Sequence, residues 1–184
     1  LMQRFFERKY IMARIIAILC VLALALCGMF SCGEESSAPM GFKEISDEAL
    51  TYHLYVPDDW TADLSTGITS AYYSGIDPSN ISVTAFELDY GITSLDDYWA
   101  MIEPDLKAVF PDLEYVVQSD AKLDGVDAKQ YIYTASMSGK SYKFMQLIAV
   151  KSNTIYTFTY TAEADKYDEH IEDVLAILDY FDFK

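Results

Sequence analysis

Carboxylate side chains are the chemically richest feature of this sequence, which has 29 acidic residues and 13 basic ones. They gather in three groups: Asp96 with Asp97; Asp120 with Asp124 and Asp127; and Asp168 with Glu169, Glu172 and Asp173. None of the groups has the spacing of a calcium-binding EF-hand loop. In the third group, residues four apart on a helix would repel one another, which a cation would relieve, but solvent and salt relieve it too. We therefore predict no metal site.

Catalysis through an imidazole base would depend on His53 or His170, the only two histidines of the chain. His53 shares a predicted strand face with Tyr55, which favours a packed or surface histidine. His170 stands beside acidic residues on a predicted helix, and we expect it on a solvated face. The sequence contains no G-x-S-x-G motif to place an activated serine. These observations favour a protein that is not an enzyme and has no cofactor.

Two further patterns have simple structural explanations. Gly139-Lys140-Ser141 resembles the end of a phosphate-binding P-loop, but the first glycine of that motif would fall at Thr134. We interpret it as a hairpin turn. The 15 tyrosines could form a sugar-binding platform, but most alternate along predicted strands, where packing across the sheet explains them.

The N-terminus has the charge pattern of an export segment. Basic residues as far as Arg14 precede 19 uncharged residues, 15–33, most of them apolar. A run of this length is close to the roughly 20 residues of a spanning helix, so an uncleaved anchor is an alternative to a signal peptide. Either interpretation leaves the basic end in the cytoplasm and the later residues outside.

The position of the cysteines distinguishes the two interpretations. All three lie in this segment, at Cys20, Cys27 and Cys32, so the later chain can form no disulfide. Ser31-Cys32-Gly33 resembles the bacterial lipoprotein signal, although Met29 and Phe30 depart from its usual pattern. The resemblance implies lipidation of Cys32 and anchoring in the membrane through two or three acyl chains. We expect a signal peptide over 1–31, a flexible tether over 32–41 and one domain over 42–184.

The composition of the expected mature chain limits its partners. From Cys32 onwards, nine lysines and no arginine stand against 28 acidic residues, a formal charge of −19. Such a domain is a poor binder of nucleic acid or anionic lipid, because both require positive charge. Cations and basic partners remain compatible with it.

Alternating apolar residues predict a strand over Leu50–Val56, ended by Pro57, after which Trp60 can fold back onto the core. Shorter strands are expected at Thr69–Tyr73 and Ile81–Leu88. Ser94 then predicts a helix N-cap, and apolar residues recur at helical spacing as far as Val109. Pro104 should break or kink this helix after Glu103.

Four strands are predicted beyond Pro111, near 115–123, 126–137, 140–151 and 154–161. Their connections are the two-residue turns Asp124-Gly125, Ser138-Gly139 and Ser152-Asn153, which force antiparallel neighbours. The third of these strands is apolar on both faces, so it should be central and covered twice. A final helix is expected over Ala164–Leu178. These elements predict an α+β fold, an α/β/α sandwich with two main helices and a mainly antiparallel sheet of about six or seven strands.

This order of elements resembles the Mog1/PsbP-like fold, and bacterial lipoproteins of that type have a similar layout. The features that carry the resemblance are Tyr52-His-Leu-Tyr-Val-Pro-Asp-Asp-Trp60, the middle helix, the hairpin Leu123-Asp-Gly-Val126 and the ending Leu178-Asp-Tyr-Phe181. The resemblance spans roughly residues 50–184 and implies a binding or assembly role. It carries over no site residue.

We therefore expect an extracytoplasmic lipoprotein, anchored through a lipid on Cys32, that acts as a non-enzymatic binding or assembly module for a protein or envelope component. The alternative is a cation- or sugar-binding accessory protein of a transporter.

Overall fold

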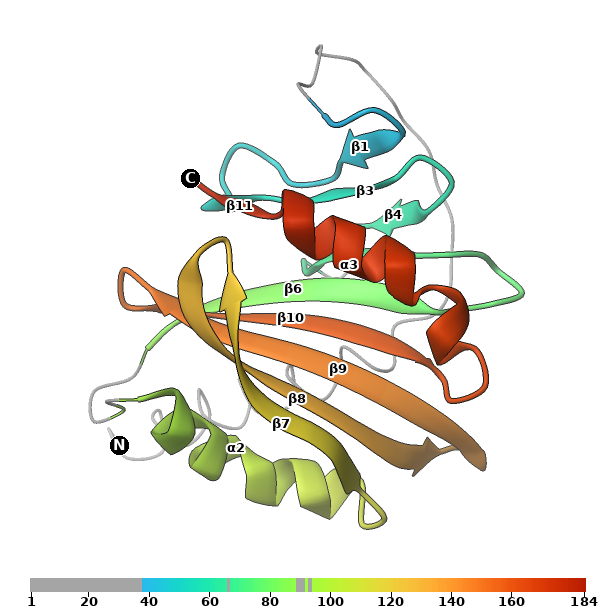
Figure 1. The fold of residues 1–184 in the computed structure, drawn as a ribbon, viewed down its shortest axis with the longest axis vertical. Coiled ribbons are helices and arrows are strands. Elements are labelled where there is room, and N and C mark those ends of the chain that lie inside the picture. Colours follow the sequence, from blue (N-terminus) through green and yellow to red (C-terminus); the bar gives the residue numbers. More distant parts are fainter. Residues whose placement is uncertain (1–37, 66, 89–91, 93) are drawn as a thin grey trace, which may run out of the picture.

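A seven-stranded antiparallel sheet lies at the centre of the computed structural model, which describes residues 38–184 apart from 66, 89–91 and 93. Figure 1 shows the sheet, whose strand order is β4-β5-β6-β10-β9-β8-β7. The strands are β4 (Thr61–Asp63), β5 (Thr69–Tyr72), β6 (Asn80–Glu87), β7 (Glu114–Leu123), β8 (Val126–Met137), β9 (Lys140–Lys151) and β10 (Thr154–Glu163). The predicted antiparallel sheet of about six or seven strands is confirmed, but the predicted strand over Leu50–Val56 lies outside it and β4, which was not predicted, is part of it.

The second half of the sheet is a meander whose turns follow from local residue chemistry. Its three turns are the predicted pairs 124–125, 138–139 and 152–153, and all six residues have positive φ, from 45° at Asp124 to 81° at Gly139. Positive φ at both central residues is the geometry of the type I′ turn, whose twist matches that of antiparallel strands. Because each turn fixes the pairing beside it, β7, β8, β9 and β10 pair in chain order.

Strand β9 separates two hydrophobic cores. Phe144 and Ile148 point into one core, whereas Met145, Leu147 and Ala149 belong to the other, and all five are buried. The interpretation of this strand as central and covered on both faces is therefore confirmed.

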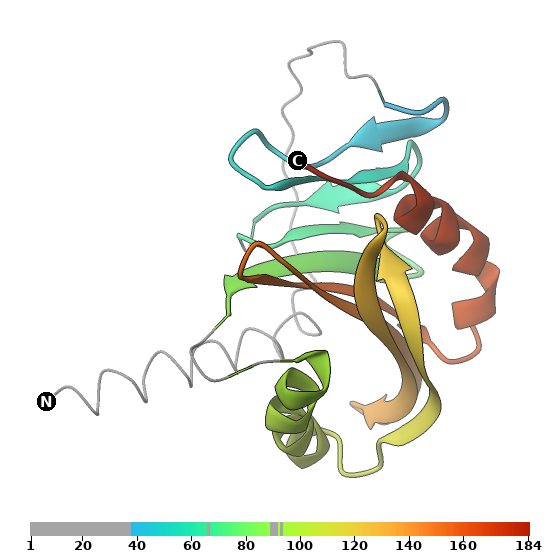
Figure 2. The ribbon, with the colours of Figure 1, turned by 60° about the vertical axis from the view of Figure 1, so that its left-hand side comes forward.

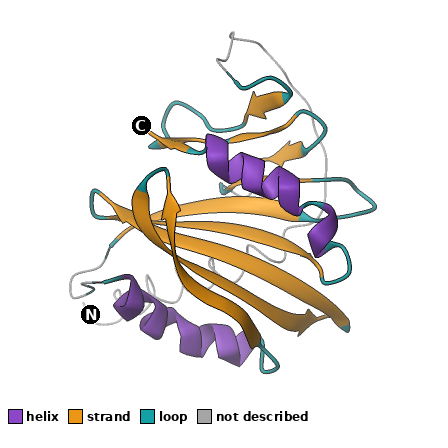
Figure 3. Cartoon of the chain, in the orientation of Figure 1, coloured by secondary structure: helices purple, strands orange, loops and turns teal. Residues whose placement is uncertain are grey.

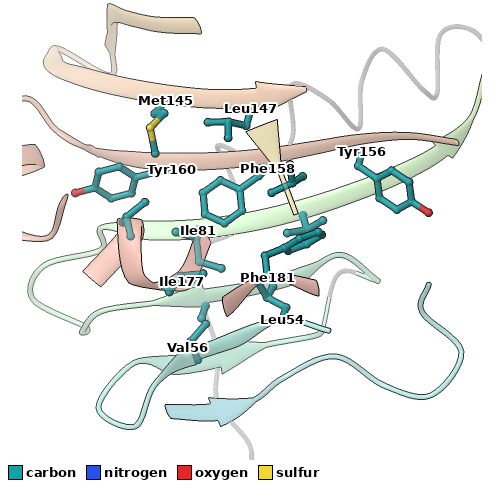
Figure 4. Packing of buried hydrophobic residues seen from close by; sticks show 14 of the residues in the cluster. Leu54, Val56, Ile81, Met145, Leu147, Tyr156, Phe158, Tyr160, Ile177 and Phe181 are labelled. Carbon is teal, nitrogen blue, oxygen red and sulfur yellow. The ribbon is translucent and has the colours of Figure 1, made fainter. Parts of the chain in front are cut away.

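One helix covers each face of the sheet. Helix α2 (Leu95–Val109) contributes Trp99 to the core around Phe144, and helix α3 (Ile171–Tyr180) contributes Ile177 to the other. Figure 2 shows the two helices on opposite sides of the strands. Figure 3 distinguishes these helices from the strands by colour, and Figure 4 shows Ile177 near Ile81 and Phe158 in the second core. This arrangement is the predicted α/β/α sandwich.

The expected strand over Leu50–Val56 is divided at Leu54, which corrects the prediction of one continuous strand. Its first part, β2 (Tyr52–His53), pairs with the C-terminal β11 (Asp182–Phe183), and its second part, β3 (Tyr55–Pro57), pairs with β1 (Phe42–Glu44). The amide of Leu54 bonds to the hydroxyl of Ser46 at 3.0 Å instead of to a strand. Alternation in sequence specifies an extended chain but not which partner each half finds.

Helix α2 begins as predicted, but Pro104 does not end it. The hydroxyl of Ser94 accepts a hydrogen bond from the amide of Asp97 at 3.0 Å, which confirms the N-cap. The helix then continues through Pro104 to Val109, so the predicted break after Glu103 is wrong. Proline removes one helical hydrogen bond, but apolar residues on both sides of it, such as Ile102 and Leu106, pack on the sheet core.

The predicted final helix over Ala164–Leu178 is also corrected. Strand β10 extends to Glu163, a 3₁₀ turn, η1, spans Tyr167–Glu169, and α3 begins only after His170. Tyr167 is buried, and its carbonyl accepts a hydrogen bond from the hydroxyl of Tyr160 at 2.8 Å. Because this contact fixes the turn before α3, residues 168 and 172 are not neighbours on one continuous helix.

The predicted membrane-proximal segments fall largely outside these elements. Residues 1–31, Cys32 and the tether as far as residue 37 lie outside the described residues. Within the described part of the chain, no helix combines the length and the apolar character that crossing a membrane requires.

Replacing Ser152 with Gly should raise the free energy of unfolding by about 0.5–1 kcal/mol, because serine at φ 51° bears a steric cost that glycine avoids. Urea unfolding followed by circular dichroism measures the change. As a matched control, Thr154→Gly in the adjoining strand should lower stability by a similar amount, because glycine is unfavourable in a strand. A loss of stability in Ser152→Gly would contradict the assigned turn.

Candidate functional site

A buried pair formed by His170 and Asp77 is the most distinctive polar feature of the described structure. Nε2 of His170 lies 2.9 Å from Oδ2 of Asp77, and the two side chains are 8% and 14% exposed. A carboxylate can only accept at this distance, so the imidazole nitrogen carries the proton that joins them. The expectation that His170 lies on a solvated face is therefore wrong.

Strand pairing brings these two residues together although 93 positions separate them in the sequence. Strand β10 pairs with β6 in a register that places Thr161 opposite Asn80. The loop that precedes Asn80 must therefore lie beside the segment that follows Thr161. Asp77 comes from this loop, and His170 comes from the junction between η1 and α3.

Hydrogen bonds within the loop fix the orientation of Asp77. Its amide donates to the hydroxyl of Ser74 at 3.0 Å, and its Oδ1 accepts from the amide and the hydroxyl of Ser79 at 3.1 and 2.7 Å. The amide of Tyr73 closes the loop by donating to the carbonyl of Ser79 at 2.8 Å. Oδ1 is thus occupied by Ser79, and Oδ2 is left to face His170.

Aromatic rings enclose the imidazole. The ring of Tyr73 lies 4.2 Å from that of His170, and the ring of Trp60 lies 6.1 Å away in an edge-on arrangement. Trp60 is completely buried, as the sequence led us to expect, and its indole N–H donates to Asp173 at 3.3 Å. The inner side of the pair is therefore lined by aromatic rings.

Glu169, a third side chain that could bind a metal ion, lies on the solvent-facing side of the pair. One carboxylate oxygen of Glu169, one of Asp77 and a ring nitrogen of His170 all lie within 4.8 Å of one another. Glu169 is 52% exposed and forms an ion pair with Lys166 at 2.9 Å. The site thus has two buried members and one that faces solvent.

The electrostatic balance keeps Asp77 ionised. Burial raises the pKa of this carboxyl, but the hydrogen bonds from His170 and Ser79 lower it by more, so the pKa lies below its ordinary value. The Ser79 hydroxyl bonds to the carboxylate and not to the imidazole, so it is on the wrong side of the pair to be a nucleophile activated by His170. The arrangement suits an ion pair or a metal ligand set better than covalent catalysis.

The other histidine has a separate environment. Nδ1 of His53 lies 2.7 Å from Glu44, with side-chain exposures of 33% and 23%, and its ring stacks 6.1 Å from that of Tyr55. The predicted packed or surface histidine on one face with Tyr55 is confirmed.

Among the described residues, the acidic groups found in the sequence form no second cluster of metal-ligating side chains. Asp96 and Asp120 share Lys129 as an ion-pair partner, Asp127 pairs with Lys122, and Asp168 pairs with Lys143. A carboxylate oxygen of Asp124 instead accepts a hydrogen bond from the amide of Phe183 at 3.0 Å. Lysines and backbone amides thus partner most of these carboxylates, and the only one of them in the cluster with His170 is Glu169.

The remaining candidate motif is structural. Gly139 forms the second position of the β8–β9 turn, and Lys140 forms an ion pair with Glu163 on the neighbouring part of the chain. The interpretation of Gly139-Lys140-Ser141 as a hairpin turn is confirmed.

Comparison with known proteins identifies the fold. The structure resembles the cyanobacterial PsbP protein (CyanoP) from Synechocystis sp. PCC 6803, with a TM-score of 0.61, 16% sequence identity and coverage of 85% of this chain and 99% of that one. It also resembles LpqN of Mycobacterium tuberculosis, described as involved in cell envelope biogenesis, with a TM-score of 0.60, 20% identity and coverage of 78% and 90%. The chain therefore has a PsbP-like fold, as its sequence indicated.

Comparisons by sequence add nothing to this assignment. No protein-family profile matches the chain, and no curated protein matches it.

Replacing Asp77 with Ala should lower the free energy of unfolding by about 3 kcal/mol, because His170 stays buried without its partner. Chemical unfolding at neutral pH measures the loss. Glu44→Ala is the control, since it removes a carboxylate from the more exposed pair with His53 and should cost about 1 kcal/mol or less. Equal losses of stability in the two variants would contradict the larger contribution of the buried pair to the free energy of unfolding.

Proposed function

We propose that this protein is an exported lipoprotein, anchored through Cys32, whose PsbP-like domain acts as a non-enzymatic binding or assembly module on the outer side of the membrane. The observation that carries the anchor is the arrangement of Ser31-Cys32-Gly33 at the end of a basic and then apolar segment. The absence of cysteine from every later position is consistent with it. LpqN, which has the same fold, is described as involved in cell envelope biogenesis, and this supports a place in the envelope.

The exposed edge of the sheet supports a binding role. Strand β7 is ten residues long and pairs only with β8 in the seven-stranded sheet, whereas β4, at the other edge, has three residues. A long edge strand presents backbone groups that can pair with an extended segment of a partner. The register shift between Tyr115 and Val117 leaves Val116 without an opposite residue, and this valine is 56% exposed. We infer that a partner binds along β7.

The acidic charge of the domain defines the chemistry of that partner. With nine lysines against 28 acidic residues beyond the signal segment, the surface favours an extended segment that is basic or uncharged. Acidic polymers and nucleic acid are disfavoured by the same repulsion.

Cys32→Ala should abolish incorporation of radioactive palmitate and release the protein from the membrane fraction. Cys27→Ala is the matched control, because it removes a thiol from the same segment but leaves Ser31-Cys32-Gly33 intact, and it should remain labelled. Labelling that persists in Cys32→Ala would contradict the lipid anchor.

Val116→Lys should abolish capture of the partner, because a lysine on an edge strand opposes addition of another strand. The measurement is quantitative affinity capture from intact cells that express the lipidated form. Leu175→Lys on α3 is the control, because it makes the same change at a residue that is 49% exposed, and it should retain the partner. Equal capture by the two variants would contradict binding along β7.

A further inference from the structure

We propose that Asp77, Glu169 and His170 form a binding site for a zinc-class divalent metal ion. The site lies where the β5–β6 loop meets the junction between η1 and α3. It shares no residue with the proposed anchor at Cys32 or with the β7 edge, so it goes beyond the function proposed above and can fail without affecting it.

The donor atoms define the class of metal. The set offers one imidazole nitrogen and two carboxylate oxygens, all within 4.8 Å of one another. Zn²⁺ and related transition metals accept this mixture and leave a fourth position for water or a partner ligand. Ca²⁺ and Mg²⁺ prefer oxygen ligands throughout, so the imidazole selects against them.

The two buried donors need to move little. Nε2 of His170 and Oδ2 of Asp77 are 2.9 Å apart, whereas two ligands at about 2.0–2.1 Å from a tetrahedral metal are roughly 3.3 Å apart. An opening of about 0.4 Å would therefore admit the ion between them. The metal takes the place of the proton on Nε2, and the bound imidazole is neutral with its one proton on Nδ1.

The surroundings of Asp77 resemble those of an oriented metal ligand. Both Ser79 hydrogen bonds go to Oδ1, which fixes the carboxylate and presents a single oxygen to the imidazole. Hydrogen bonds of this kind to the second oxygen orient a ligand before the metal arrives. The rings of Tyr73 and Trp60 pack around His170 and hold its imidazole in place.

Glu169 is the third ligand, and it lies on the solvent-facing side of the site, where the ion would enter. It is half-exposed, and its present partner Lys166 is 42% exposed. An ion pair between exposed groups contributes little stability, so a dication can displace the lysine at small cost. Asp77 and Glu169 together contribute two negative charges, which a divalent ion neutralises.

Isothermal titration of the full chain with ZnCl₂ tests this site. The protein is kept in non-ionic detergent, and any cysteine thiol that is left free is alkylated so that it cannot bind the ion. We expect one equivalent of Zn²⁺ to bind, and no saturable binding of Ca²⁺ or Mg²⁺. Calcium binding as tight as zinc binding, or no zinc binding at all, would overturn the proposal.

Three variants locate the ion. Glu169→Gln should weaken zinc binding at least about tenfold, because the loss of even an outer-shell partner commonly costs 10- to 100-fold. His170→Asn should abolish binding. Glu172→Gln, which removes a nearby exposed carboxylate outside the set, should bind like the original chain. Because Glu169 is at the surface, its variant tests the site even if His170→Asn fails to fold, and unchanged affinity in Glu169→Gln would overturn the assignment.

Discussion

The pairing of β10 with β6 is the interaction on which the rest of this structure depends. It joins the first part of the sheet to the later meander, through eight consecutive residue pairs from Thr154 opposite Glu87 to Thr161 opposite Asn80. The same register places the β5–β6 loop beside the chain that leaves β10, and so sets Asp77 against His170. A shift of one residue would turn Phe158 and its neighbours to the other face of the sheet, so burial of that strand maintains the register. The candidate site therefore depends on the core of the sheet.

Aromatic contacts then fix the C-terminal residues against β2 and the sheet. Phe181 stacks on Tyr52 with ring centroids 5.5 Å apart, and Phe183 meets Tyr156 edge-on at 4.7 Å. Each such pair contributes about 0.5–1.5 kcal/mol beyond the burial of its area. They hold β11 against β2 and keep α3 over its face of the sheet, where Trp60 and His170 meet. On the opposite face, Trp99 of α2 stacks on Tyr131 with ring centroids 3.6 Å apart, and this contact holds α2 against the sheet.

The acidic side chains differ in their burial and in their partners. The exposed side chains of Asp120, Asp127 and Asp168 each pair with a lysine, and an ion pair of this kind adds little stability. These residues account for solubility and for repulsion of anionic partners. Asp77 is different because it is buried against an imidazole, and removal of either partner would leave an uncompensated polar group inside the protein.

The sequence by itself determined the features that depend on neighbouring residues. The turns at 124–125, 138–139 and 152–153, the Ser94 cap and the two apolar faces of β9 are all local, and local chemistry decides them. Tertiary structure alone decided the division of the first strand at Leu54, the passage of α2 through Pro104 and the start of α3 after His170. It also decided the meeting of His170 with Asp77, whose loop residues predict only a turn. These outcomes depend on contacts between residues far apart in the sequence: the pairing with β11, the sheet core beneath α2 and the β6–β10 register. The pattern of neighbouring residues therefore cannot predict them.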